Sequence, residues 1–429
     1  MRIFNQISVL TVASVTLGWL TMAQADAASF TFTKIADTQS DFTSLENGIA
    51  LNDSGVVSFV GTKPTTSGVF TGNGTAIATI FDATNLPSLF PPGLPRGQLS
   101  SYPGPYPPNT YSLGKITAIN NQGSVLFTAT DSSSFKPALS PSEEGLFKST
   151  NGSISQVGGL SSYSLSSSNS LSQNYTSFDL NDSERIVSSI SRLEITPRQY
   201  SRTTIAIDGR DIAIGVSGAN APPRYVYAPA INNQGTVYYA ASGYGTDVAN
   251  QLVVNNLHVV NNGVDTPIFD PSVQVTTLAA NDSGSVFSGR LNNNIFGTGL
   301  SDPGIFQVEN GVAKRIFDGT ADFIDINNQG TVAFGSGNKI SLLSNGVSEQ
   351  IIGSGDSLLG STVQSVFFPS SKSLNNAGQV AFYAQLADGT KGIFRADPIS
   401  TKVPEPTAIL GLVAIAGLGI SSRRRYRRS

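Results

Sequence analysis

The feature that most constrains this chain is a short segment that returns seven times along its length. In each copy an apolar residue precedes an Asn, Gly usually follows three positions after that Asn, and Val or Ile follows five positions after it. The later copies lie about 50 residues apart, so one unit of that size is repeated. In six copies a Gly lies three positions after the leading Asn. The pairs are Asn52 and Gly55, Asn120 and Gly123, Asn232 and Gly235, Asn281 and Gly284, Asn327 and Gly330, and Asn375 and Gly378.

The repeated segment has the chemistry of a tight hairpin turn. An Asn side chain bonds to nearby backbone, and Gly adopts positive φ without strain. The alternation of apolar residues after the turn, as in Val125 and Phe127, predicts a strand with one buried face. In the third copy Glu184 stands in the place of Gly after Asn181, so we expect that turn to be distorted.

A second hairpin signal, such as Asn345-Gly346, follows the first in most repeats. Each repeat is therefore expected to hold four short antiparallel strands, A to D. Four strands in about 50 residues are typical of a propeller blade. The sequence predicts an all-β, seven-bladed β-propeller over residues 29–397, with stacked sandwiches or a solenoid as the alternatives.

The two ends of the repeat region complement each other. The seventh copy ends with a C strand at residues 392–397 and has no D strand before the tail. Residues 32–38 share Lys, Ile and an Asp-x-Thr pattern with residues 312–320, a D strand. The N-terminal strand is therefore expected to complete the last blade and to leave no unpaired edge.

The N-terminus has the pattern of a secretory signal over residues 1–27. Arg2 precedes an apolar run from Ile7 to Leu20, and Ala-x-Ala cleavage patterns end at Ala25 and Ala27. A retained membrane anchor is the alternative, although the run is short for one.

Residues 398–429 form a linker and a tail of three parts. Val403-Pro404-Glu405-Pro406 precedes an apolar stretch at 407–420, and Arg423, Arg424 and Arg425 follow it. An apolar stretch stopped by Arg is typical of a stop-transfer segment with its basic end on the cytoplasmic side. At 14 residues the stretch is short for a permanent transmembrane helix.

This tail resembles the PEP-CTERM sorting signal. The resemblance implies transient insertion into the inner membrane of a Gram-negative envelope, recognition by an exosortase-type protease, and removal of the tail. A plain C-terminal anchor is the alternative. The repeats also resemble a bacterial tandem-repeat family built on N-x-x-G-x-x-A-F, which residues 327–334 and 375–382 match in full. That resemblance implies surface display and no defined activity.

Few residues are available for catalysis. The chain has no Cys, and its one histidine, His258, lies in a strand-like setting without a G-x-S-x-G motif elsewhere. The net charge of −3 is too balanced to suggest nucleic-acid binding. The adjacent Glu143 and Glu144 are read as a solvated turn.

The turn residues Asp53, Asp182 and Asp282 could suggest a calcium site. A calcium loop needs several converging oxygen ligands, and each turn offers a single carboxylate, so turn chemistry is the preferred interpretation. We therefore predict no catalytic residue, no cofactor and no metal ligand.

The long insertions are expected on one face of the disc. They cover residues 83–114 and 158–175 between repeats, and 131–143, 242–250 and 290–303 between B and C strands. The first insertion is rich in Pro and aromatic residues, which suits a preorganised recognition surface, with a plain spacer as the alternative. The residues of this candidate binding loop are Phe90, Tyr102, Tyr106 and Tyr111.

These features together predict an exported cell-surface or extracellular-matrix protein without enzymatic activity. Its expected partners are exopolysaccharide or an envelope protein, besides the processing protease. The alternative is a hydrolase or lyase acting on extracellular polysaccharide. That activity would need a carboxylate cluster at the channel mouth, on the face with the long loops.

Overall fold

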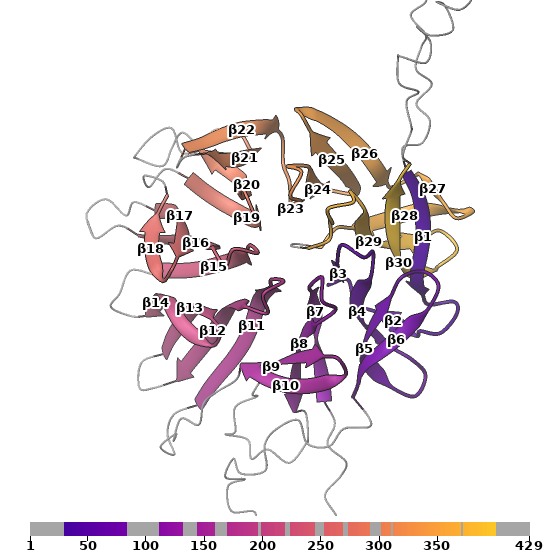
Figure 1. The fold of residues 1–429 in the computed structure, drawn as a ribbon, viewed down its shortest axis with the longest axis horizontal. Helices are drawn as coiled ribbons and strands as arrows, with labels where there is room; N and C mark the ends of the chain where they lie inside the picture. The colour runs from indigo at the N-terminus through magenta and orange to yellow at the C-terminus, as the bar shows by residue number, and fades with distance from the viewer. Residues whose placement is uncertain are drawn as a thin grey trace, which may run out of the picture.

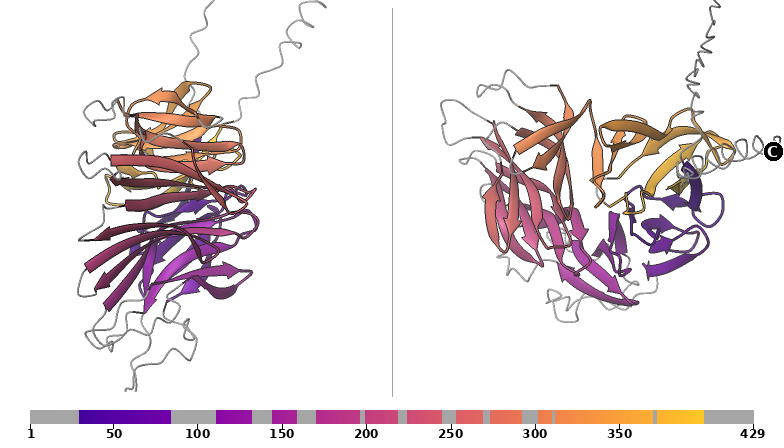
Figure 2. Two further views of the ribbon diagram at one scale, coloured as in Figure 1. Left: turned by 90° about the vertical axis from the view of Figure 1, so that its left-hand side faces the viewer. Right: turned by 45° about the horizontal axis from the view of Figure 1, so that its top comes forward.

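The computed structural model describes residues 30–83, 111–131, 144–158, 170–195, 199–218, 224–244, 253–268, 273–291, 302–309, 312–369 and 372–399. Strands, turns and short connections make up these residues. Seven antiparallel sheets stand around a central axis and form a disc, seen face-on in Figure 1 and edge-on in Figure 2. The predicted seven-bladed β-propeller is confirmed.

The blades follow the order of the repeats, and blades 1 to 6 are each built from strands that are consecutive in the sequence. Blades 1 to 3 hold β2 (Ser44–Leu45), β3 (Ala50–Leu51), β4 (Val57–Thr62), β5 (Ser67–Gly72) and β6 (Ile77–Asp82); β7 (Tyr111–Ile119), β8 (Val125–Asp131), β9 (Glu144–Thr150) and β10 (Ser153–Gly158); and β11 (Ser170–Leu180), β12 (Ile186–Ile195), β13 (Gln199–Ile207) and β14 (Arg210–Gly218). Blades 4 to 6 hold β15 (Arg224–Ile231), β16 (Val237–Tyr244), β17 (Val253–Asn261) and β18 (Val264–Pro267); β19 (Val273–Asn281), β20 (Gly284–Leu291), β21 (Gly304–Glu309) and β22 (Val312–Asp318); and β23 (Phe323–Ile326), β24 (Val332–Ser336), β25 (Lys339–Ser344) and β26 (Val347–Gly353). Blade 7 holds β27 (Ser357–Leu358), β28 (Ser361–Phe367), β29 (Val380–Leu386), β30 (Lys391–Pro398) and β1 (Phe30–Asp37).

The ring is closed by the N-terminal strand, as predicted. β1 pairs with β30 in antiparallel register from Phe30↔Pro398 to Asp37↔Gly392. Blade 7 therefore takes its outermost strand from the start of the chain and the rest from the end (Figure 1). Phe30, Ile35 and Ala36 of β1 are buried, so closure adds core contacts as well as backbone hydrogen bonds.

The core lies between blades, because each blade presents apolar side chains to its neighbours. One cluster, for example, joins Ile205 of blade 3 to Val237 and Tyr239 of blade 4. The aromatic residues of the repeat are all buried, as the strand alternation predicts. They are Phe59, Phe127, Tyr239, Phe334 and Phe382.

The turn of the third repeat keeps the geometry of the turns in repeats 1, 2, 4, 6 and 7, and the expected distortion is wrong. The fifth repeat is the one that departs: Gly284 lacks the expected positive φ, and its N–H donates to Asn281 Oδ1 at 2.9 Å. Glu184 adopts φ 64°, and its N–H still donates to the Asn181 carbonyl at 3.1 Å. Left-handed backbone is unfavourable for Glu. Its carboxylate is held by Lys148 Nζ at 2.7 Å and by Ser124 Oγ at 2.7 Å, both in blade 2. These contacts offset the backbone strain.

Two of the predicted insertions are shorter than the sequence indicates, because strands extend into them. Residues 111–114 lie in β7, and residues 170–175 lie in β11, so the strands extend into both predicted insertions. Glu144 begins β9 and is half-buried, with Oε2 accepting from the Tyr175 N–H at 2.6 Å, so the solvated-turn interpretation is wrong for it. Glu143 and most of the insertions lie outside the described residues.

Candidate functional site: the channel mouth

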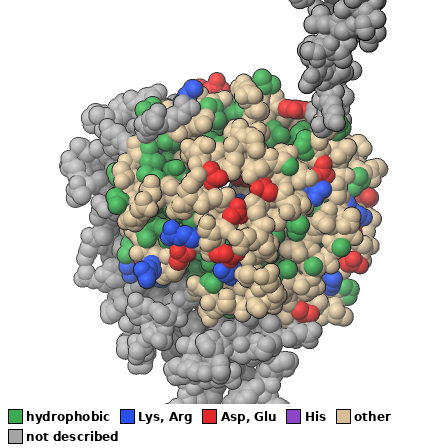
Figure 3. All heavy atoms as spheres, viewed as in Figure 1, with side chains coloured by type: hydrophobic (Ala, Val, Ile, Leu, Met, Phe, Trp, Pro, Cys, Tyr) green, Lys and Arg blue, Asp and Glu red, His purple; other side chains and the backbone are tan. Residues whose placement is uncertain are grey.

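The A–B turns of all seven blades meet at one end of the central channel. They line a cavity of about 90 Å³, which opens on the face of the disc that carries the short A–B and C–D turns, here called the short-turn face. Acidic side chains gather around the hollow at the centre of the disc in Figure 3. This cavity is the candidate site, because the repeated Asn and Asp residues converge on it.

An inner ring is formed by the leading Asn residue of each turn. Each Nδ2 donates to the backbone carbonyl of the leading Asn in the next blade, at 2.8–3.3 Å. Asn375 donates to the Asn52 carbonyl and closes the circle. Each Oδ1 accepts N–H groups of its own turn, as Asn327 does from Gln329 and Thr331. The side-chain amide of each leading Asn therefore binds its own turn through Oδ1 and the next blade through Nδ2. The ring consists of Asn52, Asn120, Asn181, Asn232, Asn281, Asn327 and Asn375.

An outer ring is formed by the residue after each leading Asn. Its backbone N–H donates to the side-chain Oδ1 of its counterpart in the next blade, at 2.7–3.0 Å. No two Asp residues are neighbours in this ring, which avoids like-charge repulsion. Asn121 Nδ2 bridges the carboxylates of Asp53 and Asp182 at 2.7 and 2.9 Å. The outer ring consists of Asp53, Asn121, Asp182, Asn233, Asp282, Asn328 and Asn376.

Two buried carboxylates lie beneath the rings, each two residues before a leading Asn. Asp179 accepts from the N–H groups of Leu180 at 2.7 Å and of Ile231 at 3.1 Å. Asp325 accepts from three N–H groups at 2.7–2.8 Å, two of them in blade 7. Burial, together with the charge of Asp179, raises the pKa of Asp325 to about 6, although its N–H donors act in the opposite direction.

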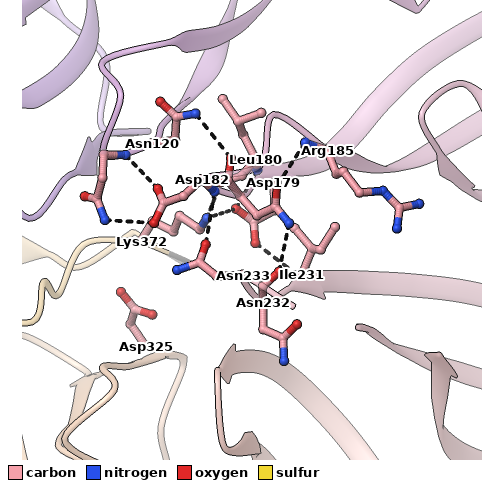
Figure 4. A network of polar contacts seen from close by, with 12 residues as sticks. Asn120, Asp179, Leu180, Asp182, Arg185, Ile231, Asn232, Asn233, Asp325 and Lys372 are labelled. Carbon is pink, nitrogen blue, oxygen red and sulfur yellow. Dashed lines mark hydrogen bonds and ion pairs between the residues drawn. The ribbon is translucent and has the colours of Figure 1, made fainter. Parts of the chain in front are cut away.

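A lysine from blade 7 crosses the channel and pairs with Asp179, as Figure 4 shows. Lys372 Nζ lies 3.1 Å from Asp179 Oδ1 and also donates to the Leu180 carbonyl in blade 3. The backbone of Lys372 has φ 60°, and its carbonyl accepts from the Leu51 N–H of blade 1 at 2.6 Å. Residues 372–374 thus tie blade 7 to blades 1, 3 and 6 at the axis.

Every carboxylate oxygen of Asp179 and Asp325 already accepts a backbone N–H. An acid or base in catalysis needs an oxygen that reaches the reacting group. These two carboxylates instead join blades 3 to 4 and 6 to 7. The arrangement is suited to holding the ring together.

The Asp residues of the outer ring also link neighbouring blades. Asp53, Asp182 and Asp282 each accept an N–H from the preceding blade and an Asn amide at the second oxygen. Within the described ranges, no group of three or more His, Cys, Asp or Glu side chains is placed to hold a metal ion.

His258 lies in β17, in the strand setting that the sequence predicts. Its Nδ1 is 3.1 Å from Asp265 Oδ1, and Tyr239 Oη donates to Asp265 Oδ2 at 2.6 Å. The imidazole stacks on the Tyr239 ring at 4.8 Å. Burial and the bond to Asp265 raise the pKa of Tyr239 above its usual value. His258, Tyr239 and Asp265 thus join the neighbouring strands β17, β16 and β18 of blade 4.

The other predicted site residues are not part of the channel mouth. Tyr111 begins β7, where it pairs with Asp131 at the far end of the blade. Phe90, Tyr102, Tyr106 and the whole sorting tail, Val403 to Arg425, lie outside the described residues. The part of the chain that the structure describes holds no helix long and apolar enough to cross a membrane.

Sequence reasoning missed Asp179, Asp325 and Lys372. A signal for the two Asp residues was present two positions before the leading Asn. The other copies have small residues there, Ala50, Ala118, Ala230, Ala279 and Ser373, while two copies have Asp. Ala50, Ala118, Ala230 and Ala279 are buried in apolar clusters between neighbouring blades, so an Asp at this position is a polar exception in an otherwise apolar contact.

Comparison with known proteins gives a family match for a small part of the chain. Residues 356–410, which cover much of blade 7, match a family of unknown function, DUF7453. No curated protein sequence matches the chain.

Solved structures with similar folds include the β-propeller domain of the Trilobed protease from Pyrococcus furiosus. It is 9% identical at a TM-score of 0.49, with 82% of this chain and 96% of that one covered. The Pyrococcus horikoshii acylaminoacyl peptidase is 10% identical at a TM-score of 0.48, covering 86% of this chain. This chain spans 54% of that peptidase. A Fusarium graminearum α-L-arabinofuranosidase is 8% identical at a TM-score of 0.35, with 87% and 99% covered. These likenesses concern the fold alone.

Proposed function

We propose that this protein is an exported, non-enzymatic β-propeller of the cell surface or extracellular matrix that binds exopolysaccharide or an envelope protein. The N-terminal signal pattern and the C-terminal tail resembling PEP-CTERM support export and processing by an exosortase-type protease. The tail would insert in the inner membrane until it is removed.

The hydrogen bonding of the channel carboxylates carries the non-enzymatic part of the proposal, because each of their oxygens already accepts at least one donor of the protein. Asp179, Asp325 and the three outer-ring Asp residues each hold a neighbouring blade through backbone N–H groups. The cluster also lies on the short-turn face, opposite to where the polysaccharide hydrolase or lyase alternative would need it. Its residues act as inter-blade joints and leave recognition to the other face.

The long insertions supply the binding surface in this proposal. β6 ends at Asp82, which pairs with Gly68 beside the short turn between β5 and β4. The D–A and B–C connections therefore leave from the same face, which is opposite to the channel mouth. Aromatic rings such as those of Tyr102 and Tyr106 can stack on sugars or pack on a protein while their hydroxyls stay hydrated.

A pull-down of the tail-less protein on native extracellular matrix tests the proposal. Replacing Tyr102, Tyr106 and Tyr111 with Ala should weaken attachment by at least roughly tenfold, because three stacked rings at about 0.5–1.5 kcal/mol each contribute about 1.5 kcal/mol or more. Thermal stability should change little. The matched control is Gln329→Ala, an exposed change on the short-turn face, which should bind like the parent.

Two results would contradict the proposal. If the triple variant binds like the parent, the loop is only a spacer. If the parent protein releases new reducing ends from the matrix polysaccharide, and Asp179→Asn abolishes that release in a folded variant, the hydrolase alternative replaces it.

A further inference from the structure

Both ends of the propeller leave the disc at one point. In the β1–β30 ladder Phe30 is the partner of Pro398, so the residues before β1 and after β30 begin side by side. Asp397 accepts from Gln379 Nε2 at 2.5 Å. The Cγ atom of Pro398 lies 3.6 Å from the point that a Cβ atom would occupy on Gly378. Gly378 belongs to the A–B turn of blade 7. The exit point is therefore on the short-turn face, at its rim.

The apolar segments lie at short and similar distances from this point in the sequence. Eight residues, 399–406, separate Pro398 from the C-terminal apolar stretch, and they can span at most about 28 Å. Nine residues, 21–29, separate Leu20 from Phe30. A seven-residue strand such as β29 is about 24 Å long, which sets the thickness of the blade. A tether from the short-turn rim would use nearly its full length to pass around to the other face.

We infer that the protein, while held by its C-terminal apolar segment, turns the short-turn face and its channel mouth toward the membrane. The opposite face, which carries the long connections, then points away from the membrane, toward the matrix. This inference rests on the proposed membrane insertion of the tail. It adds that ring closure fixes the direction in which the binding surface is displayed.

The tether sets this orientation, and lipid attraction does not. The outer ring places Asp53, Asp182 and Asp282 around the centre of the short-turn face, where they would be repelled by anionic headgroups. The same orientation is therefore expected on zwitterionic and on anionic vesicles.

The absence of Cys from the chain allows a direct test with single labelled positions. Gln329 and Asn338 are both exposed and lie at opposite ends of β24, about 20 Å apart along the disc axis. We would introduce Gln329→Cys or Asn338→Cys in the full chain, attach a donor fluorophore, and reconstitute each variant into phosphatidylcholine vesicles that carry a headgroup acceptor. Energy transfer to the acceptor falls steeply with height above the bilayer. The label at 329 should show at least about twofold higher transfer than the label at 338.

A longer tether provides the matched control. Inserting about 20 Gly and Ser residues after Thr401 should keep the chain on the vesicles and make the two labels equal, since a flexible linker lets the disc turn freely. Repeating the measurement with phosphatidylglycerol in the vesicles should leave the difference between labels unchanged.

The outcomes separate the inference from the proposed function. If the full chain does not float with vesicles, or floats equally well when truncated after Ser400, membrane insertion of the tail is wrong. If the full chain floats through its tail but the two labels transfer equally, or 338 transfers more, the orientation is overturned while the insertion stands.

Discussion

At the scale of single residues, the central feature is the buried carboxylate of Asp325. It joins blade 6 to the Ser373 and Leu374 N–H groups of blade 7 and is 4% exposed. Burial favours the protonated form, so the pKa is about 6 in the folded protein against 3.8 for the ordinary value. Lys372, which would be the natural counter-ion, is already paired with Asp179.

Because of this raised pKa, the ionised Asp325 carboxylate lowers the stability of the folded protein at neutral pH. Between about pH 4 and pH 6 the folded state binds more protons at this position than the unfolded state does. Its contribution to stability is therefore present at low pH and is lost as pH rises through that window, by about 3 kcal/mol in total. Asp325→Asn should remove this slope. Urea unfolding of both proteins at several pH values from 4 to 7 gives the difference curve.

A flat difference curve across that window would show that Asp325 titrates normally. The matched control is Asp388→Asn, at an exposed turn where hydrogen bonds to Thr390 lower the pKa of the carboxyl. Its difference curve should lack the fall between pH 4 and pH 6.

At the scale of elements, blade 7 is held together by a strand that is distant in sequence. β1 supplies the outer edge of a sheet whose other strands come from residues 357–398. Without β1, the edge of β30 would be exposed, and such an edge is a template for pairing with other chains.

Deleting residues 29–37 should lower the free energy of unfolding by several kcal/mol and promote association. Phe30 and Ile35 alone bury side chains worth about 2 kcal/mol each, and the backbone ladder is lost with them. Thermal denaturation and light scattering measure the two effects. A synthetic peptide of residues 29–38 should restore the melting temperature, and a scrambled peptide should not. An unchanged melting temperature in the truncated chain would show that β1 does not close the ring in solution.

The elements that followed from the sequence are those that depend on local turn chemistry. Asn151-Gly152 and Asn262-Gly263, for example, have φ values of 50–79°, as an Asn-Gly hairpin requires. The period and the paired ends were enough to predict seven blades and their closure. The inner strands were less predictable: blade 1 divides its strand into β2 and β3, and Leu374 forms only an isolated bridge with Val380. Long-range contacts at the axis set these irregularities, and a single repeat does not encode them.

The channel itself was predicted in part. The leading Asn residues were interpreted as turn formers, which their Oδ1 contacts confirm. Their Nδ2 groups and the outer-ring carboxylates bond to the next blade, however, which becomes evident only when seven copies are arranged in a circle. Lys372 gave no local signal, because its partner Asp179 is 193 residues earlier in the chain.

At the scale of the whole molecule, the proposed processing of the C-terminal tail would change the charge of the propeller. The tail after Pro406 contains five Arg residues and no acidic residue, so its removal changes the formal charge from −3 to −8. Processing would leave a more acidic domain free of its apolar segment.

Material isolated from the native cell surface should therefore lack the residues after about Pro406. Intact-mass measurement should find a chain that begins near Ala27 and ends near the Val403–Pro406 motif. Replacing Arg423, Arg424 and Arg425 with Ser should lead to accumulation of the longer form in the membrane fraction. A native chain that still ends at Ser429 would refute processing and favour a permanent C-terminal anchor.

The direction of β30 also determines how the molecule bears mechanical load. The strand runs from the face with the long connections to the short-turn face, where it ends at Pro398. If the tail anchors the protein as proposed, a force on the opposite face pulls β30 lengthwise between β29 and β1. All of the hydrogen bonds on its two sides are then strained at once, in shear, instead of being opened one after another from an end. The seam that closes the ring is thus placed where a tethered disc can resist being pulled from its anchor.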